Sequence, residues 1–393
     1  MTVSDVAIVG VGITKFGKHI ETPLKDLGGH AITLALQDSN REIADIQMAF
    51  VANAMASIVT GQVSAVGQGI LRANGFSGIP VYNLDNACAG SSSAISLAVN
   101  AIRSGAADTV LVLGVEKLFS NDRSRAYIAL NGAADLDTVK LSGVDVAKES
   151  VFVASIYPER LSSYESRYGL NKETLAKITV KNRTHATCNP LAQFTSPLTI
   201  DEVLASRQIV GPVAALMCAP LSDGAAAVIL TRATQVSSNQ RPVWVLGSAV
   251  GMGAPPGPES SIRRVAAIAY DQAKLVPSDI DVAEVHDSIS FNELLAYEEL
   301  GFCELGQGVR LVDEEATSIG GRLPINTSGG LESRGHPVAA TGAAQIAELT
   351  AQLRGEANKR QVPGARYALA ENAGGFAIDD TAAIAVTILG AAG

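Results

Sequence analysis

A weak internal repeat is the feature that most constrains the fold of this chain. Residues 6–53 have the pattern of a strand, a glycine-rich turn, a helix and a second strand, and residues 243–287 repeat this order. A long apolar helix is predicted after each unit, at Ser91–Arg103 and at Ala340–Leu353, and a largely apolar strand follows each helix. Because a duplicated unit dictates the architecture, we predict two halves that share one α/β fold.

The stretch between the halves differs in composition, being richer in charge, tyrosine, asparagine and proline. Amphipathic patterns within it predict helices at Val151–Tyr168 and Lys172–Arg183. Ser222–Thr231 is typical of a tight turn and a strand, which we expect to rejoin the sheet of the first half. We therefore predict an N-terminal half (1–116 with 222–242), an inserted loop domain (117–221) and a C-terminal half (243–393).

Composition and charge exclude several classes of protein. The 393 residues are 47% hydrophobic and rich in glycine, which is typical of a large globular α/β protein. A net charge of −9, with no run of Lys or Arg, argues against nucleic-acid binding. The first residues lack a signal-peptide pattern, and no apolar stretch reaches the ~18 residues that span a bilayer. We therefore expect a cytoplasmic protein without membrane insertion.

Cys88 is the candidate nucleophile among four widely spaced cysteines, which form no CxxC pair and lack the histidine spacing of a zinc site. Gly90 and the serines around it predict the start of a helix directly after Cys88. Backbone N–H groups and the positive end of the helix dipole would favour its thiolate. A buried structural cysteine is the commoner alternative, and this motif alone leaves both open.

His336 is the candidate base, because Gly335 and Pro337 restrict the backbone on either side of its imidazole. An imidazole held in this way suits the deprotonation of a thiol, whereas a histidine in a surface turn is the alternative. His286 and Asp287 end a predicted strand, where catalytic groups of α/β sheets gather. Asp287 could orient an imidazole or cap the next helix.

Gly374 and Gly375 follow the last predicted strand and would let backbone amides approach a ligand closely. Two such amides could form an oxyanion hole. An ordinary turn that links two strands is the alternative.

Together these motifs resemble the thiolase superfamily, and closely its sterol-carrier-protein type. The resemblance covers essentially the whole chain and is strongest after Val282. It rests on several independent motifs in the same order, namely Asn-Ala-Cys-Ala-Gly-Ser-Ser around Cys88, Asn189–Phe194, Ser222–Ala227, His286-Asp287 followed by Asn292–Glu298, Ser328–Gly330, Gly335–Pro337 and Leu353–Gly364.

The resemblance implies a thiolase fold, with five layers in the order αβαβα, two similar halves and an inserted loop domain. It also implies a homodimer or a dimer of dimers that uses acyl-CoA and CoA as substrates, with no tightly bound cofactor and no metal. Cys88 would accept the acyl group with help from His336, and both His286 and His336 would hold the enolate oxygen. The amide of Cys88, with one from the Gly374–Phe376 turn, would form the oxyanion hole.

The resemblance further marks Ser328, Gly329 and Asp287 as candidate substrate-binding residues. It also implies a possible partner. Members of this branch without a fused lipid-carrier domain often work with a small protein that combines a zinc ribbon and an OB-fold, so a heteromeric complex is expected by analogy alone.

The chain departs from the family where a second cysteine exchanges the substrate proton. Gly374 stands near the place of one such cysteine, and Ser288 replaces the other. A serine hydroxyl is a far weaker acid than a thiol with a pKa near ~8.5. We therefore expect thiolytic cleavage or Claisen condensation of an unusual acyl-CoA. The alternatives are an aldolase or acyltransferase subunit of a heteromeric complex, and a non-catalytic subunit that binds acyl-CoA or lipid.

Overall fold

The computed structural model describes residues 5–255, 257 and 259–392, and its nine main strands form one sheet with the order β3-β2-β4-β7-β1-β8-β11-β10-β9. The N-terminal strands are β1 (Val6–Ile13), β2 (Met48–Ala52), β3 (Val81–Leu84), β4 (Thr109–Glu116) and β7 (Gly224–Arg232). The C-terminal strands are β8 (Val243–Gly251), β9 (Val282–Glu284), β10 (Tyr367–Ala377) and β11 (Asp380–Ala391).

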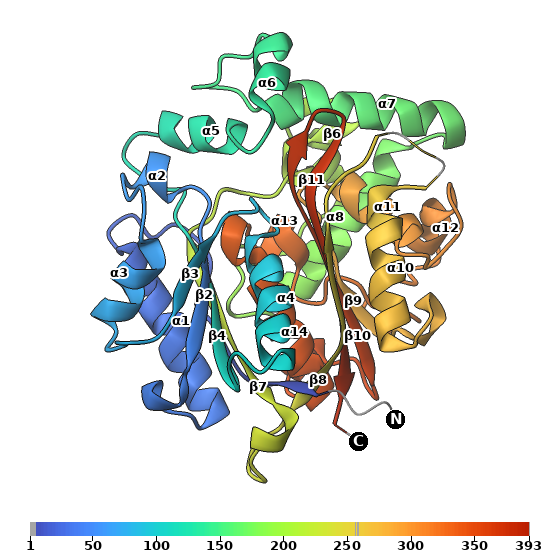
Figure 1. Ribbon diagram of the computed structural model, residues 1–393. Helices are drawn as coiled ribbons and strands as arrows, with labels where there is room; N and C mark the ends of the chain where they lie inside the picture. The colour runs from blue at the N-terminus through green and yellow to red at the C-terminus, as the bar shows by residue number, and fades with distance from the viewer. Residues whose placement is uncertain (1–4, 256, 258, 393) are drawn as a thin grey trace.

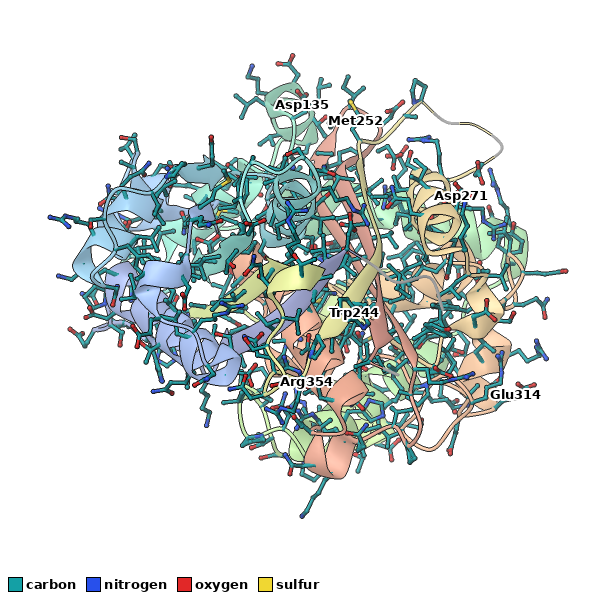
Figure 2. The ribbon with its side chains drawn as sticks, turned by 60° about the horizontal axis from the view of Figure 1, so that its bottom comes forward. Asp135, Trp244, Met252, Asp271, Glu314 and Arg354 are labelled. Carbon is teal, nitrogen blue, oxygen red and sulfur yellow. The ribbon has the colours of Figure 1, made fainter. Side chains whose placement is uncertain are left out.

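The sheet consists of two half-sheets joined by a short antiparallel pairing of β1 with β8. Ala7 pairs with Trp244 and Ile8 with Val243 at this junction, and Figure 2 shows Trp244 there. All other strand pairs lie within one half. The two half-sheets can therefore diverge and enclose helices between them.

Five layers result, as the resemblance to the thiolase superfamily implied. The central layer contains α4 (Gly90–Arg103) and α14 (Thr341–Arg354), which lie side by side between the half-sheets (Figure 1). The outer face of the N-terminal half is covered by α1 (Leu24–Ser39) and α3 (Val66–Ala73), and that of the C-terminal half by α10 (Ser261–Ala273). Small and branched apolar side chains of α4 and α14 fill the central core between the two half-sheets.

The segment between β4 and β7 carries most of the remaining helices, and β7 returns to the first half-sheet between β4 and β1, as predicted. Beside the short hairpin of β5 (Gln208–Val210) and β6 (Val213–Ala214), its helices are α5 (Ser124–Asn131), α6 (Leu136–Ser142), α7 (Tyr157–Tyr168), α8 (Lys172–Thr187) and α9 (Ile200–Ala205). The helix predicted over Val151–Tyr168 contains a π-helical turn, Phe152–Ile156, before α7.

The remaining helices are α2 (Ala56–Val59), α11 (Ser290–Glu299), α12 (Gly308–Asp313) and α13 (Gly330–Arg334). None of the helices within the described residues is both long and apolar enough to cross a bilayer.

One prediction of local structure was wrong. Gly374 and Gly375 do not form a turn after the last strand, because both lie inside β10 and this strand continues to Ala377. The turn comes at Ile378 and Asp379 and leads into β11, a strand that the sequence analysis did not predict. Gly374 pairs with Ala383 of β11, whereas Gly375 has a φ of +66° and departs from the extended geometry of its neighbours.

Candidate active site

Cys88 lies in the loop that joins β3 to α4. Ala87 has a positive φ of 48°, which turns the chain sharply before the nucleophile candidate. The amide of Ala89 donates to the Asn86 carbonyl at 3.0 Å, and the side chain of Asn86 donates to the Ser93 hydroxyl of α4 at 2.9 Å. The loop is thus fixed to the first turns of α4, and Cys88 stands two residues before that helix, as the sequence predicted.

His336 follows α13, and hydrogen bonds hold both its backbone amide and its imidazole ring. Its amide donates to the Ser222 hydroxyl at 2.8 Å, and its Nδ1 is 2.8 Å from the Thr341 hydroxyl. The preceding Gly335 has a φ of +111°, and a Cβ on it would lie 2.8 Å from the Ser222 oxygen, so a side chain is excluded there. With Nδ1 engaged, Nε2 is the nitrogen left to interact with a thiol.

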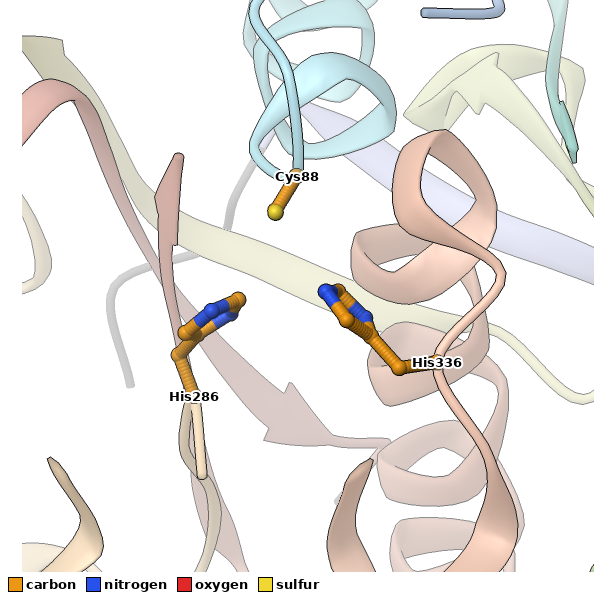
Figure 3. A group of neighbouring side chains, drawn as sticks. All are labelled: Cys88, His286 and His336. Carbon is orange, nitrogen blue, oxygen red and sulfur yellow. The ribbon is translucent and has the colours of Figure 1, made fainter. Parts of the chain in front are cut away.

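His286 comes two residues after β9 and faces His336. Its amide donates to the Glu371 carboxylate at 2.9 Å. The two imidazole rings are 5.3 Å apart between centroids and nearly perpendicular, at 82°. The donor atoms of Cys88, His286 and His336 all lie within 4.8 Å of one another, and Figure 3 shows the three side chains converging. The fold thus brings together three residues that are far apart in sequence.

A cavity of about 860 Å³ opens onto these three side chains. Its wall also includes Ser288 and Gly375, together with residues of the segment between β4 and β7. Its size is in the range of small-molecule sites. Among the described residues, Cys88, His286 and His336 are also the group whose ligand atoms lie close enough together to hold a metal ion. The same three side chains suit acyl transfer.

Burial determines the protonation states of the site. It raises the pKa of the Cys88 thiol to about 12, and the charge of Glu116 adds to this, whereas hydrogen bonds from the backbone N–H groups of Gly375 and of Cys88 itself act in the opposite direction. The prediction that the thiolate is favoured was therefore wrong for the free protein, because desolvation outweighs the hydrogen bonds from these two N–H groups.

Burial likewise lowers the pKa of His286 to about 4, against an opposing effect of the Asn372 side chain. It lowers the pKa of His336 well below its usual value, and the neighbouring His286 and Arg334 add to this effect. At neutral pH the resting site therefore holds a neutral thiol beside two neutral imidazoles, of which one can accept the thiol proton.

The backbone around Gly374–Phe376 contributes one amide to the site. The Gly375 N–H reaches the Cys88 sulfur, whereas the Phe376 N–H donates to the Ala133 carbonyl at 2.9 Å and is therefore occupied. At Gly374 a Cβ would lie 2.5 Å from the carbonyl oxygen of the loop residue Asn86. Gly374 thus permits the close approach of β10, and the N–H groups of Gly375 and Cys88 are the pair placed to bind an oxyanion.

Ser288 lines the cavity, and its hydroxyl is part of a hydrogen-bonded chain. Its Oγ is 2.9 Å from the Tyr157 hydroxyl and accepts from the Asn292 side chain at 2.8 Å. No sequence motif marks Tyr157, which lies 131 positions before Ser288. The pattern of residues 151–168 predicts a helix, but it does not indicate which side chains of that helix face Ser288.

Asp287, Ser328 and Gly329, predicted to bind substrate, are not among the residues that line the cavity. Asp287 accepts hydrogen bonds from the amides of Leu331 and Glu332, at 2.7 and 3.3 Å, and so holds the start of α13. Of the two roles considered for Asp287, it thus caps a helix, although this is α13 rather than the next helix along the chain.

Ser328 donates to the carboxylate of Glu284 at 2.6 Å. A Cβ on Gly329 would lie 2.6 Å from the Cβ of Ala186 in α8. Both residues are buried and pack within the loop rather than in the wall of the cavity.

Comparisons with known proteins agree with this geometry. Residues 6–210 match the family model "Thiolase, N-terminal domain", and residues 254–387 match "Thiolase C-terminal domain-like". The chain is 38% identical to an acetyl-CoA acetyltransferase of Methanothermobacter thermautotrophicus, over 94% of this chain and 96% of the relative. It is 37% identical to human sterol carrier protein 2, over 95% of this chain and 70% of that protein.

Among solved structures, the chain resembles an "Ltp2-ChsH2(DUF35) aldolase", with a TM-score of 0.79, 25% identity and coverage of 99% and 98% of the two chains. Human mitochondrial 3-ketoacyl-CoA thiolase has the same fold, with a TM-score of 0.72, 16% identity and coverage of 99% of each chain. The resemblance seen in the sequence and the five-layer fold are thereby confirmed, and the chain belongs to the thiolase family of acyltransferases.

Proposed function

We propose that this protein is an acyl-CoA C-acyltransferase in which Cys88 carries the acyl group as a thioester during cleavage or condensation of a 3-ketoacyl-CoA. The main support is the convergence of Cys88, His286 and His336 within 4.8 Å in one cavity. A cysteine beside an imidazole base is the arrangement that nucleophilic catalysis by a thiol requires.

The neutral resting site suggests how each group acts. As Cys88 attacks the carbonyl carbon, Nε2 of His336 takes its proton, so that charge appears only during the reaction. The N–H groups of Cys88 and Gly375 stabilise the oxyanion of the tetrahedral intermediate. His286 and His336, with rings 5.3 Å apart, then hold the oxygen of the enolate that leaves or attacks.

The replacement of the second cysteine by Ser288 supports an unusual acyl-CoA as the substrate. An aldolase subunit is the second candidate, because the chain resembles a structure described as an aldolase of Ltp2 with ChsH2(DUF35). Under that reading, a small partner protein would assist with CoA substrates. The retained Cys88 favours the thiolase, since an aldol cleavage of a 3-hydroxyacyl-CoA forms no thioester with the enzyme. It also weighs against a non-catalytic binding subunit.

Intact-mass measurement after incubation with acetyl-CoA tests the acyl-enzyme. We expect one acetyl adduct on the parent and none on Cys88→Ala, whereas Cys188→Ala, which changes another partly buried cysteine outside the cavity, should keep it. His336→Ala should slow formation of the adduct, and His286→Ala should form it but fail at the carbon–carbon step. A parent that never forms an adduct would exclude the thiolase mechanism.

A panel of CoA thioesters separates the two candidate functions. Cleavage of 3-ketoacyl-CoA that depends on added CoA indicates a thiolase. Cleavage of 3-hydroxyacyl-CoA that needs neither CoA nor Cys88 indicates an aldolase. Purification from the native source shows whether a small partner accompanies the chain, and full activity of the isolated chain would argue against one.

A further inference from the structure

Tyr157 places a phenol hydroxyl in the cavity wall, in the same cavity as Cys88 and both histidines. It is the first residue of α7, directly after the π-helical turn Phe152–Ile156. Such turns occur frequently at functional sites. Its hydroxyl is 2.9 Å from Ser288 Oγ, and Asn292 donates to the same oxygen at 2.8 Å.

The hydroxyls of Ser288 and Tyr157 together have one hydrogen that they can donate to a ligand. Asn292 donates to Ser288, so the bond between the Ser288 and Tyr157 hydroxyls uses only one of their two hydrogens. Within the described part of the chain, neither hydroxyl has another acceptor. Whichever way the pair is oriented, one O–H hydrogen remains for a group in the cavity.

The reaction proposed above needs such a proton. When the acyl group passes to Cys88, the bond between C2 and C3 of the 3-ketoacyl-CoA breaks and C2 must be protonated. His286 and His336 are engaged with the oxygen atoms and the Cys88 proton, and a serine hydroxyl alone is too weak an acid. We propose that Tyr157 is a catalytic residue whose hydroxyl, held by Ser288, supplies this proton. The inference rests on the proposed function and deepens it.

The protons balance over one turnover. The Cys88 thiolate, having given its proton to His336, adds to C3. The C2–C3 electron pair then goes to C2, which takes the proton of Tyr157. The resulting tyrosinate removes the thiol proton of the incoming CoA, whose sulfur attacks the acyl group on Cys88. Cys88 leaves as a thiolate and recovers its proton from His336, and nothing is oxidised or reduced.

The environment of the phenol suits this task. Burial raises the pKa of Tyr157 to about 12, the hydrogen bond with Ser288 opposes this, and a charge on Cys88 would raise the pKa further. Tyr157 and Cys88 are thus close enough for their charges to interact. At neutral pH the phenol keeps its proton until a stronger base, the α-carbanion of a thioester, is formed beside it.

Tyr157→Phe tests the inference by removing one oxygen atom. Single-turnover cleavage of acetoacetyl-CoA reports the carbon–carbon step. Acetylation of Cys88 by p-nitrophenyl acetate reports the nucleophile alone, because this leaving group needs no proton. We expect cleavage to fall by ~10²–10⁴, the usual contribution of a general acid, with acetylation unchanged. Tyr168→Phe, at the exposed end of the same helix, should leave both rates at the parent value.

Several results would overturn the assignment. These are parent-like cleavage by Tyr157→Phe, an equal loss of cleavage and acetylation, and a parent that acetylates Cys88 but never cleaves acetoacetyl-CoA. If Cys88 of the parent is not acetylated at all, it is the proposed function that fails. If Tyr157→Phe does not fold, replacement of the tyrosines by 3-fluorotyrosine lowers the phenol pKa, and the pH profile of cleavage should move to lower pH. An unmoved profile would reject Tyr157 as the acid.

Discussion

At Cys88, burial outweighs the backbone hydrogen bonds that favour the thiolate. The helix start after Cys88 could be predicted from Gly90 and the serines, but desolvation depends on the residues that the fold packs around the thiol. Those residues come from β4 and β10 as well as from the local loop. A local pattern therefore placed Cys88 correctly before a helix and misjudged the charge of its thiol.

The raised pKa of Cys88 gives a pH dependence that can be measured. Because the thiolate is the reactive form, alkylation by iodoacetamide should rise about tenfold per pH unit from neutrality to beyond pH 9, with no plateau before the pKa of about 12. Intact mass at a series of times gives the rate. His336→Ala should be slower near neutral pH and approach the parent at high pH. A plateau near ~8.5, the ordinary thiol value, would contradict the account of burial.

Ser288→Cys should place a thiol, a stronger acid than a serine hydroxyl, beside Tyr157. The replacement changes one atom and should be tolerated by the packing. We expect faster cleavage of acetoacetyl-CoA than in the parent, with unchanged acetylation of Cys88, which indicates an improvement confined to proton transfer. Ser288→Ala, which has the space but no acid, should show no gain. If the parent already turns over at ~10 per second, the usual enzyme median, the missing thiol is not limiting.

Among the elements, β10 brings the backbone of the proposed oxyanion hole against the Cys88 loop. At Gly374 an added Cβ would lie 2.5 Å from the Asn86 carbonyl oxygen and 2.6 Å from the Ala89 nitrogen. Both atoms belong to the backbone, and β10 pairs with β9 and β11 on its two sides. Neither β10 nor the Cys88 loop can therefore shift easily to make room for a side chain. This contact makes Gly374 a structural requirement of the site even though its own amide is not the donor.

Gly374→Ala should therefore uncouple stability from activity. Overpacking of this kind typically lowers the free energy of unfolding by ~1–3 kcal/mol, and the protein should still fold. A small shift of Gly375 away from Cys88 should slow acetylation by about 10²-fold, as the loss of an oxyanion donor does. Thermal unfolding and the acetylation rate measure the two effects. Acetylation at the parent rate would show that β10 does not position the oxyanion hole.

The elements also show which parts of the structure could be predicted. The helices α4 and α14 were predicted to within one or two residues, because long apolar runs begin after glycine-rich turns. The Gly374-Gly375 pair is typical of turns, and only the pairing of β10 with β11 makes it a strand. Tyr157 meets Ser288 through the packing of α7 on the C-terminal half, a contact that no local pattern specifies.

At the scale of the whole molecule, the active site depends on how the two halves meet. Cys88 precedes α4 of the first half, and His336 lies five residues before the first residue of α14 in the second. These helices touch in the central layer, where the amide of Ala343 donates to the Ser91 hydroxyl at 2.9 Å. The distance between Cys88 and His336, the proposed nucleophile and base, therefore depends on the packing of α4 against α14.

Gly342→Ala tests this dependence. A Cβ at Gly342 would lie 1.9 Å from the Ser92 hydroxyl and 2.7 Å from the Ser92 backbone nitrogen. The hydroxyl can rotate away, but the nitrogen cannot, so α14 must move relative to α4. We expect a lower unfolding temperature and a loss of Cys88 acetylation by p-nitrophenyl acetate that is larger than the unfolded fraction explains.

Gly69→Ala is the matched control, since Gly69 lies in the helix α3 and a Cβ there would meet nothing within 4 Å. It should keep full acetylation and gain up to ~1 kcal/mol from the helix propensity of alanine. The same propensity acts at Gly342, so any destabilisation there reflects contact between the halves. If Gly342→Ala is as stable as Gly69→Ala and acetylates at the parent rate, the packing of α4 on α14 does not set the geometry of the site.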